Sequence, residues 1–388
     1  MVSSDGFTLE YGTAPAGEIF CPYRVCPLGA HTDHSLGTQT GFALDRGIYI
    51  SYSPSGSETI SASSALFDRR IVFEISNIPS VKQNDKADYL RGAALILKRK
   101  YNIENGINAF IHGTMPVGGL SSSAAVTLGF INALCKVNSL VISREEMIEC
   151  ALFAEREYVG VRCGKLDQTC EMYGKKDSLL YIDSAAGEHT LIPAGNKDFD
   201  IAVFFAGKQR VLAGGKYNLR VDELKAAAYV IKAFSGGDYG TFAETFMADV
   251  SREDFEKYAR KLPDNFRMRA AHFFDECERV EKGVEAFRQG DLERFGSLMT
   301  ASGFSSINLW QTGSDELKCL TEILSKTKGV YGARFSGAGF NGSCVALTDP
   351  RKREEIEYEV KKEYLKIYPR YENEYLSAFC KSADAMEI

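Results

Sequence analysis

The segment PVGGLSSSAAVTLGFINALCKV, residues 116–137, limits most strongly how this chain can fold. Gly118 and Gly119 permit a tight turn whose backbone amides face outward, and three serines follow where a helix N-cap is favoured. The apolar run that follows predicts a buried helix. Because the first N–H groups of a helix lack backbone partners, this turn could bind a triphosphate. A simple capped helix is the alternative, but it would explain only one of the serines.

A second glycine-rich stretch, RFSGAGFNGSCVAL at residues 334–347, matches G-x-G-x-x-G through Gly337, Gly339 and Gly342. In a dinucleotide-binding fold that pattern opens a helix. Here the following residues, SCVAL, predict a strand, so the dinucleotide interpretation fails. We expect instead a glycine loop between two strands, close to a ligand or to another loop. The Walker pattern G-x-x-x-x-G-K-[ST] is absent from the sequence.

Two acidic residues stand on either side of a glycine-containing loop in AEREYVGVRCGKLDQ, residues 154–168. Glu155 falls near the end of a helix predicted for residues 144–160, and Asp167 follows after the loop. Acidic groups separated by a turn can bind a magnesium ion and deprotonate a hydroxyl, which are the two roles that phosphoryl transfer needs. Either acid taken alone is more often a solvated surface charge.

The segment CPYRVCPLGAHTDHSLG, residues 21–37, allows two interpretations from its residues alone. Cys21, Cys26, His31 and His34 offer the sulfur and nitrogen atoms that zinc prefers. Their spacing, C-x4-C-x4-H-x2-H, is not a usual zinc pattern. The other interpretation is a polar site that binds a substrate.

The length and composition restrict the class of protein. A chain of 388 residues predicts two domains, and the Gly- and Pro-containing stretch at 185–200 favours a boundary between residues 1–194 and 195–388. The formal charge of −6 argues against a nucleic-acid partner. No apolar stretch reaches the ~18 residues of a membrane span, and no signal-peptide pattern is present, so we expect a cytoplasmic protein. Ten scattered cysteines predict free thiols.

These motifs, in this order, resemble those of the GHMP kinase superfamily, and within it the galactokinase branch. RVCPLGAHTDHSLG resembles the galactokinase signature R-V-N-L-I-G-E-H-T-D-Y, and GLSSSAA resembles the phosphate loop. CGKLDQ is similar to the C-G-I-M-D-Q motif, and RFSGAGFNGSCVAL to the closing glycine motif; YLRGA and KYNLR add further matches. The resemblance spans residues 14–347. It implies an α+β fold with two lobes, the first similar to domain 2 of ribosomal protein S5.

The resemblance also implies roles for individual residues and favours the substrate site over zinc. Asp167 is expected to be the catalytic aspartate, with Arg24 beside it to orient and activate the anomeric hydroxyl of a sugar. Ser123 and Glu155 match the Mg²⁺ ligands of the family. The residues expected to wrap the phosphates of ATP are Gly118, Gly119, Leu120, Ser121, Ser122 and Ser123. The residues that match sugar-contacting positions are His31, Asp33, Gly164 and Tyr217.

One departure from the galactokinase pattern bears on the substrate. Galactokinases carry glutamate where this chain has Ala30, and that glutamate faces the C6 hydroxyl of galactose. A substrate with its own C6 carboxylate would be repelled by that glutamate, by about 4 kcal/mol at ~4 Å and an effective dielectric near 20. The sequences of three motifs also resemble galacturonokinases more than galactokinases: PYRVCPLGAHTDH, YNLR and VYGARFSGAGFNG. We therefore expect ATP-dependent phosphorylation of D-galacturonate at O1.

A uronate needs a positive partner, and Arg162 and Arg210 are the first candidates, ahead of Lys165 and Lys208, because a guanidinium can hold a carboxylate at two points. The alternatives are a galactokinase, a 1-kinase for another sugar such as glucuronate or arabinose, and a sugar-sensing regulator without catalysis. We expect ATP, Mg²⁺ and a small sugar or sugar acid as ligands, no membrane partner, and a monomer or homodimer. Gly303 stands where galactokinases have histidine, and the sequence gives no physical reason for it.

Overall fold

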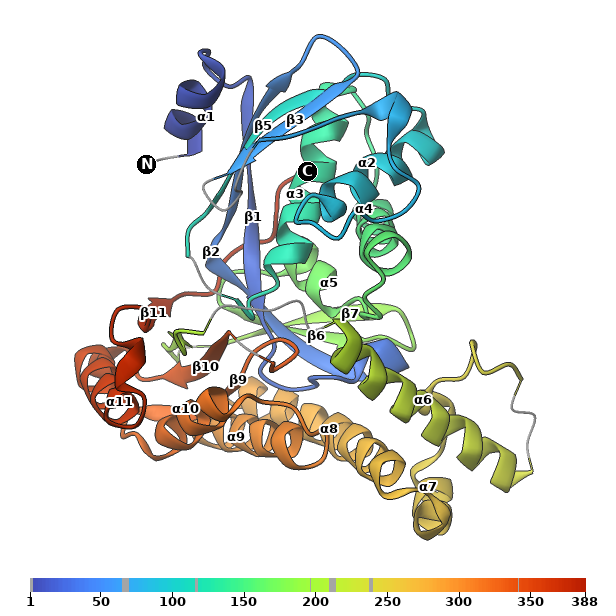
Figure 1. The fold of residues 1–388 in the computed structure, drawn as a ribbon. Helices are drawn as coiled ribbons and strands as arrows, with labels where there is room; N and C mark the ends of the chain where they lie inside the picture. The colour runs from blue at the N-terminus through green and yellow to red at the C-terminus, as the bar shows by residue number, and fades with distance from the viewer. Residues whose placement is uncertain are drawn as a thin grey trace.

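The first half of the chain folds into a mixed sheet with helices beside it (Figure 1). The computed structural model describes residues 3–64, 70–115, 118–195, 197–208, 214–236, 240–340 and 342–388. The strands of this seven-stranded sheet are β1 (Gly17–Val25), β2 (Thr38–Pro54), β3 (Thr59–Ser64), β4 (Ile71–Glu74), β5 (Ile107–Gly113), β6 (Ser178–Asp183) and β7 (Glu188–Pro193). Their order is β4-β3-β5-β2-β6-β7, with β1 also paired to β2. The β3–β5 pair is parallel, and the other pairs are antiparallel.

Strand β2 connects this sheet because it is long enough to pair with three neighbours. Its first residues pair with β6, and its later residues pair with β1 and then with β5. The loop of residues 26–37 between β1 and β2 is therefore held at both ends by the same sheet. Arg24 lies near the end of β1, where the strand is still paired with β2, so the sheet fixes its position.

Four helices of the first half lie on one side of the sheet, and helix α1 (Ser3–Tyr11) lies on the other (Figure 1). The four are α2 (Asp88–Tyr101), α3 (Ser122–Val137), α4 (Arg144–Phe153) and α5 (Leu166–Tyr173). Most side chains of α3 are buried, which confirms the predicted buried helix. The helix predicted for 144–160 ends earlier, because after α4 the chain widens into a π-helical turn, Ala154–Val159, that stops at Gly160 with φ +85°.

The second half of the chain forms a smaller sheet covered by helices (Figure 1). Its antiparallel strands, in the order β11-β8-β10-β9, are β8 (Asp200–Phe205), β9 (Val330–Phe335), β10 (Ser343–Thr348) and β11 (Leu376–Cys380). The helices are α6 (Gly214–Ser235), α7 (Arg252–Tyr258), α8 (Asp264–Arg288), α9 (Leu292–Asn308), α10 (Asp315–Lys326) and α11 (Arg353–Ile367). The second glycine-rich stretch joins β9 to β10, as predicted.

The two sheets meet in a shared apolar core. The first sheet ends with β7 and the second begins with β8, on either side of the boundary we proposed between residues 194 and 195. Across that boundary the rings of Phe42, Phe199 and Phe287 pack with centroid separations of 5.6–5.9 Å. The end of the chain also returns to the first half, where the Met386 amide donates to the Glu171 carbonyl at 2.9 Å. The halves are therefore held by common packing.

Close contact between helix α9 and strand β9 explains Gly303. A Cβ atom at Gly303 would lie 2.9 Å from the Arg334 Cβ atom, so the glycine lets the helix approach the strand that carries Arg334. Helix α9 makes a second close approach to β9 two turns earlier, at Gly296. A Cβ atom at Gly296 would lie 2.2 Å from the Tyr331 carbonyl group. Between them the Thr300 hydroxyl accepts the Ala333 amide at 3.1 Å, which satisfies one N–H group of β9.

The cysteines and histidines near the start of the chain do not form a metal site. All ten cysteines are free, as the sequence predicted. Among the described residues, no three His, Cys, Asp or Glu side chains gather in a way that could hold a metal ion. The zinc interpretation of residues 21–37 is therefore without structural support. Within the same described ranges, no helix combines the length and apolar character needed to cross a membrane.

Replacing Gly296 tests the α9–β9 packing. Gly296→Ala should lower the free energy of unfolding by about 2–3 kcal/mol, because the added methyl group meets backbone that cannot rotate away. Gly215→Ala is the matched control, since it also lies in a helix but its added Cβ would meet nothing within 4 Å. Urea unfolding curves measure both. Equal effects of the two substitutions would contradict the packing described.

Candidate active site

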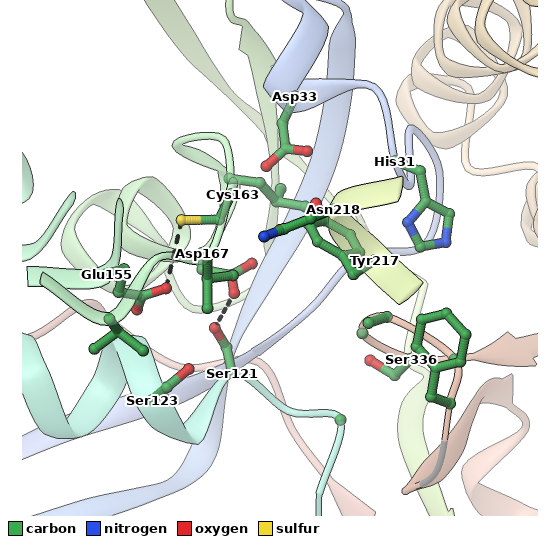
Figure 2. Close-up of a pocket in the computed structure, with 18 of the residues that line it drawn as sticks. His31, Asp33, Ser121, Ser123, Glu155, Cys163, Asp167, Tyr217, Asn218 and Ser336 are labelled. Atoms are coloured by element: carbon green, nitrogen blue, oxygen red, sulfur yellow. Dashed lines mark hydrogen bonds between the residues drawn. The ribbon is translucent and has the colours of Figure 1, made fainter. Parts of the chain in front are cut away.

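A cavity of about 430 Å³ gathers most of the predicted site residues (Figure 2). They reach it from the end of β1, the loop after it, the start of α3, the π-helical turn, the start of α5 and helix α6. The predicted residues that line it are Arg24, Ala30, His31, Asp33, Gly119, Ser121, Ser123, Glu155, Asp167 and Tyr217. Elements from both halves of the chain therefore build one site.

Four other predicted residues, Gly118, Leu120, Ser122 and Gly164, do not line the cavity, and at least three of them support it. A Cβ atom at Gly164 would lie 2.3 Å from an Asp33 carboxylate oxygen, so this glycine makes room for the Asp33 side chain. The Leu120 carbonyl accepts the Arg24 amide at 3.2 Å. The Gly118 carbonyl accepts the Ser343 hydroxyl at 3.0 Å. These contacts hold the lining residues in place.

The two glycine-rich segments pack directly against each other. A Cβ atom at Gly342 would lie 2.7 Å from the Gly118 carbonyl oxygen, and one at Gly337 would lie 3.2 Å from the Gly119 Cα atom. Gly119, Gly337 and Gly342 all have φ between +70° and +116°, a region that favours glycine. The expectation that the second loop lies close to another loop is confirmed. This contact brings β9 and β10 to the beginning of helix α3.

Ser121 stands at the start of α3, but its hydroxyl does not cap the helix. The hydroxyl donates instead to the Oδ2 atom of Asp167. Ser121 is the N-cap residue, and its side chain makes no hydrogen bond to the first turn of the helix. Of the three serines that stand where an N-cap is favoured, Ser121 therefore binds Asp167 instead of the helix. Ser121 adopts φ +66° to reach Asp167. The first-turn amides keep the character of an anion site.

Arg24 and Asp167 form a partly buried ion pair in the cavity. The Arg24 Nε atom donates to the Asp167 Oδ1 atom at 2.6 Å, and Nη1 donates to the Gly119 carbonyl at 3.4 Å. Burial alone would lower the pKa of Arg24, but the Asp167 carboxylate raises it overall. The structure therefore brings together the two residues expected to be catalytic, with each carboxylate oxygen of Asp167 accepting one donor.

Glu155 and Ser123 face the same part of the cavity (Figure 2). Glu155 is buried, and its Oε2 atom accepts the Cys163 thiol at 3.4 Å. Burial raises the pKa of Cys163 well above its usual value, and Glu155 adds to the shift, so the sulfur remains a thiol that can donate. A carboxylate with a hydroxyl supplies the hard oxygen ligands that Mg²⁺ prefers. The donor set thus fits the predicted metal ligands.

His31, Asp33 and Tyr217 lie together on the opposite side of the cavity (Figure 2). The imidazole of His31 stacks on Trp310 with a 5.2 Å centroid separation and a 6° interplanar angle. Burial, with several nearby cations, lowers its pKa well below the usual value, so the ring is neutral. Burial and the charge of Asp167 raise the pKa of Asp33 to about 6. This side can therefore accept and donate hydrogen bonds around a polar ligand.

Three of the basic residues expected to bind a carboxylate, Arg162, Lys165 and Lys208, are described by the structure and do not line the cavity. The Arg162 guanidinium is exposed and forms an ion pair with Asp222, so this expectation is corrected. Arg210 lies outside the described residues. Lys165 pairs with Glu149 at 2.5 Å on the surface, and Lys208 lies 3.4 Å from a Glu316 oxygen. Arg162, Lys165 and Lys208 therefore each pair with an acidic side chain that does not line the cavity.

The polar residues that line the cavity but that the sequence analysis did not identify include Lys82, Asn218 and Arg334. The Lys82 ammonium donates to the Val159 carbonyl at 2.7 Å, and nothing in its sequence context signals a site. The Asn218 amide donates to the Gly160 carbonyl at 3.0 Å. Asn218 belongs to KYNLR, and Arg334 opens the second glycine-rich segment. Both residues lie in motifs that carry the family resemblance, which implies a role in KYNLR for Tyr217 alone.

Comparison with protein families matches two models to this chain. The GHMP kinases N terminal domain matches residues 88–175, and the GHMP kinases C terminal model matches residues 284–366. The first match contains the start of α3 and Asp167. The second contains α9, β9 and β10, and therefore the second glycine loop.

Individual proteins are similar over nearly the whole chain. A galacturonokinase from Arabidopsis thaliana is 36% identical over 95% of this chain and 93% of its own length. A galactokinase from Limosilactobacillus reuteri (strain DSM 20016) is 31% identical over 89% of each. The crystal structure of Lactococcus lactis galactokinase complexed with galactose superposes with a TM-score of 0.89 at 24% identity, covering 99% of this chain and 98% of that one. A Methanococcus jannaschii mevalonate kinase gives 0.64 at 17% identity, over 95% and 98%. These structures share the fold.

The raised pKa of Asp33 predicts a stability that depends on pH. Between the ordinary value of 3.8 and about 6, the folded state holds a proton that the unfolded chain has lost. The contribution of Asp33 to the free energy of unfolding therefore falls as pH rises through this interval. Asp33→Asn removes this titrating group. The free energy of unfolding of the variant minus that of the wild type should therefore be larger at pH 7 than at pH 4. Urea unfolding at the two pH values measures this; a constant difference would contradict it.

Proposed function

This chain belongs to the GHMP kinase family and is a sugar kinase, and on that premise we propose that it phosphorylates D-galacturonate at O1 with ATP. The products are galacturonate 1-phosphate and ADP. The observation that carries the proposal is the Arg24–Asp167 ion pair, which shares one cavity with the start of α3 and with Ala30. A kinase acting on an anomeric hydroxyl needs the first two features side by side, and Ala30 bears on the choice of sugar.

In the proposed reaction, the sugar O1 attacks the γ-phosphorus of ATP and the bond from that phosphorus to the bridging oxygen breaks. The electron pair leaves with ADP, and the O1 proton passes to Asp167. Arg24 and Ser121 each occupy one lone pair of the Asp167 oxygens, which leaves others to accept the O1 hydroxyl. Because such transition states are loose, orientation and charge neutralisation matter more than base strength.

The phosphates of ATP would lie at the start of α3. Gly119 and Ser121 line the cavity there, next to the second glycine loop, and the first amides of a helix favour an anion. Ser123 and Glu155 would hold Mg²⁺, which supplies positive charge to the phosphates when it is bound. The Glu155 side chain is kept in orientation by the Cys163 thiol. The Arg24 guanidinium donates to the Gly119 carbonyl, so the residue proposed to orient the sugar also contacts the turn proposed to bind the phosphates.

The choice of galacturonate depends on Ala30. This residue lines the cavity and presents only a methyl group where the galactokinase pattern has a glutamate. A C6 carboxylate could occupy that space without repulsion by about 4 kcal/mol, the amount that a second carboxylate ~4 Å away would add. The higher identity to a galacturonokinase, 36% against 31% for a galactokinase, supports the same choice.

A panel of free sugars tests this proposal. Initial rates with ATP and Mg²⁺ should give a higher kcat/KM for galacturonate than for galactose, glucuronate or arabinose. We expect a preference over galactose of at least about tenfold, because galactose lacks the charged group. A preference for galactose would support the galactokinase alternative and reject galacturonate.

Asp167→Asn separates catalysis from binding in the same assay. Turnover should fall by at least about a thousandfold, because the anomeric hydroxyl loses its acceptor, while galacturonate still binds in calorimetry. Turnover near the wild-type level would reject Asp167 as the catalytic residue.

Substitutions at Ala30 test the origin of substrate choice. Ala30→Glu should lower kcat/KM for galacturonate by about a hundredfold or more, because two carboxylates would share one space. Ala30→Gln is the matched control, with nearly the same volume and no charge, and should cost much less. Similar losses in the two variants would mean that size rather than charge excludes galacturonate.

A further inference from the structure

Arg334 is a buried cation at the wall of the cavity whose role the proposed reaction leaves open. It lies on β9, and its side chain is 1% exposed. Its Nε atom donates to the Phe335 carbonyl at 3.1 Å, Nη1 to the Ser302 hydroxyl at 3.0 Å and Nη2 to the Ser306 hydroxyl at 3.2 Å. A guanidinium carries five N–H groups. The described part of the chain offers no hydrogen-bond acceptor to the remaining two.

The positive charge of Arg334 is only partly compensated. Within the described residues, the carboxylate of Glu276 is the only one within 4.0 Å of the Arg334 guanidinium, and its Oε1 atom lies at that limit. Glu276 already pairs with Arg279 at 2.7 Å. Burial lowers the pKa of the neighbouring His272 to about 4, so that ring adds no charge at neutral pH. Two guanidinium groups thus share one carboxylate, and a buried cation without a full counter-charge is costly.

The network around Arg334 also holds the backbone that carries Ala30. Glu276 Oε1 accepts the Gly29 amide at 2.9 Å, and it lies 4.0 Å from Arg334 Nη1. The Ala30 carbonyl is hydrogen-bonded to His272 Nε2 at 3.0 Å. A single Glu276 oxygen therefore lies between the Arg334 guanidinium and the Gly29 amide beside Ala30.

The other lining cations already have partners. Arg24 is paired with Asp167, and the Lys82 ammonium donates to the Val159 carbonyl. Among the described lining cations, Arg334 combines a charge that Glu276 only partly compensates with a link, through the same Glu276 oxygen, to the Gly29 amide beside Ala30.

We propose that Arg334 binds the C6 carboxylate of the sugar acid and thereby sets the preference for a uronate over a neutral hexose. The inference rests on the proposed function. The carboxylate of the substrate takes the space that the Ala30 methyl group leaves open, accepts the unused N–H groups and supplies the missing negative charge. Ser302, Ser306 and the Phe335 carbonyl hold the guanidinium in place before the ligand arrives.

The test compares two substrates in two variants. D-Galactose differs from D-galacturonate at C6, where it carries a neutral hydroxymethyl group. Arg334→Gln should lower the ratio of kcat/KM for galacturonate to that for galactose by about a hundredfold. Arg279→Gln is the matched control, because Arg279 also pairs with Glu276 but does not line the cavity. In that variant the ratio should stay within about threefold of the wild type.

A second variant keeps the test decisive if Arg334→Gln does not fold. Arg334→Lys retains the charge but loses the two-point geometry, and should lower the same ratio by about tenfold. Equal losses for both sugars, or a KM increase for ATP alone, would overturn the inference in favour of a structural or phosphate-binding role. An unchanged ratio would also overturn it while the proposed function stands. If the wild type does not prefer galacturonate, the proposed function itself fails, and this inference fails with it.

Discussion

The contact between two glycine-rich segments is the constraint on which the rest of this structure depends. The backbone at Gly118 and Gly119 touches the backbone at Gly337 and Gly342 so closely that a Cβ atom at Gly342 would lie 2.7 Å from a carbonyl oxygen. A side chain there would push β9 and β10 away from the start of α3. Arg334 lies on β9, and Asp167 is hydrogen-bonded to Ser121 at the start of α3. The contact between the glycine segments therefore determines how far apart these two sides of the cavity lie.

Several charged side chains in the cavity are only partly neutralised by other protein groups, so a ligand can complete the balance of charge. Asp167 is held by Arg24 and Ser121, and this cluster meets the first turn of α3, where an anion is favoured. Asp33 is kept near an acidic neighbour, which with burial raises its pKa to about 6. Arg334 shares Glu276 with Arg279. Such arrangements lower the stability of the empty protein and are the usual sign of a binding site.

The sequence predicted the parts of the site that depend on local motifs. Asp167, Arg24 and the turn at Gly118–Gly119 come from short segments whose chemistry is visible in the residues, and the structure brings them together. Arg162 was misjudged because its orientation depends on Asp222, which lies sixty residues away. The roles of Gly303 and Arg334 follow from the packing of α9 against β9. That packing is a tertiary contact, which no local sequence pattern predicts.

The most direct test of this account is a crystal structure with galacturonate and a non-hydrolysable ATP analogue bound together. The account predicts that O1 lies within hydrogen-bond distance of an Asp167 oxygen and in line with the γ-phosphorus, with the phosphates at the start of α3. It also predicts the C6 carboxylate beside Ala30. A sugar bound with C6 toward Asp167, or a nucleotide bound away from the glycine segments, would contradict it.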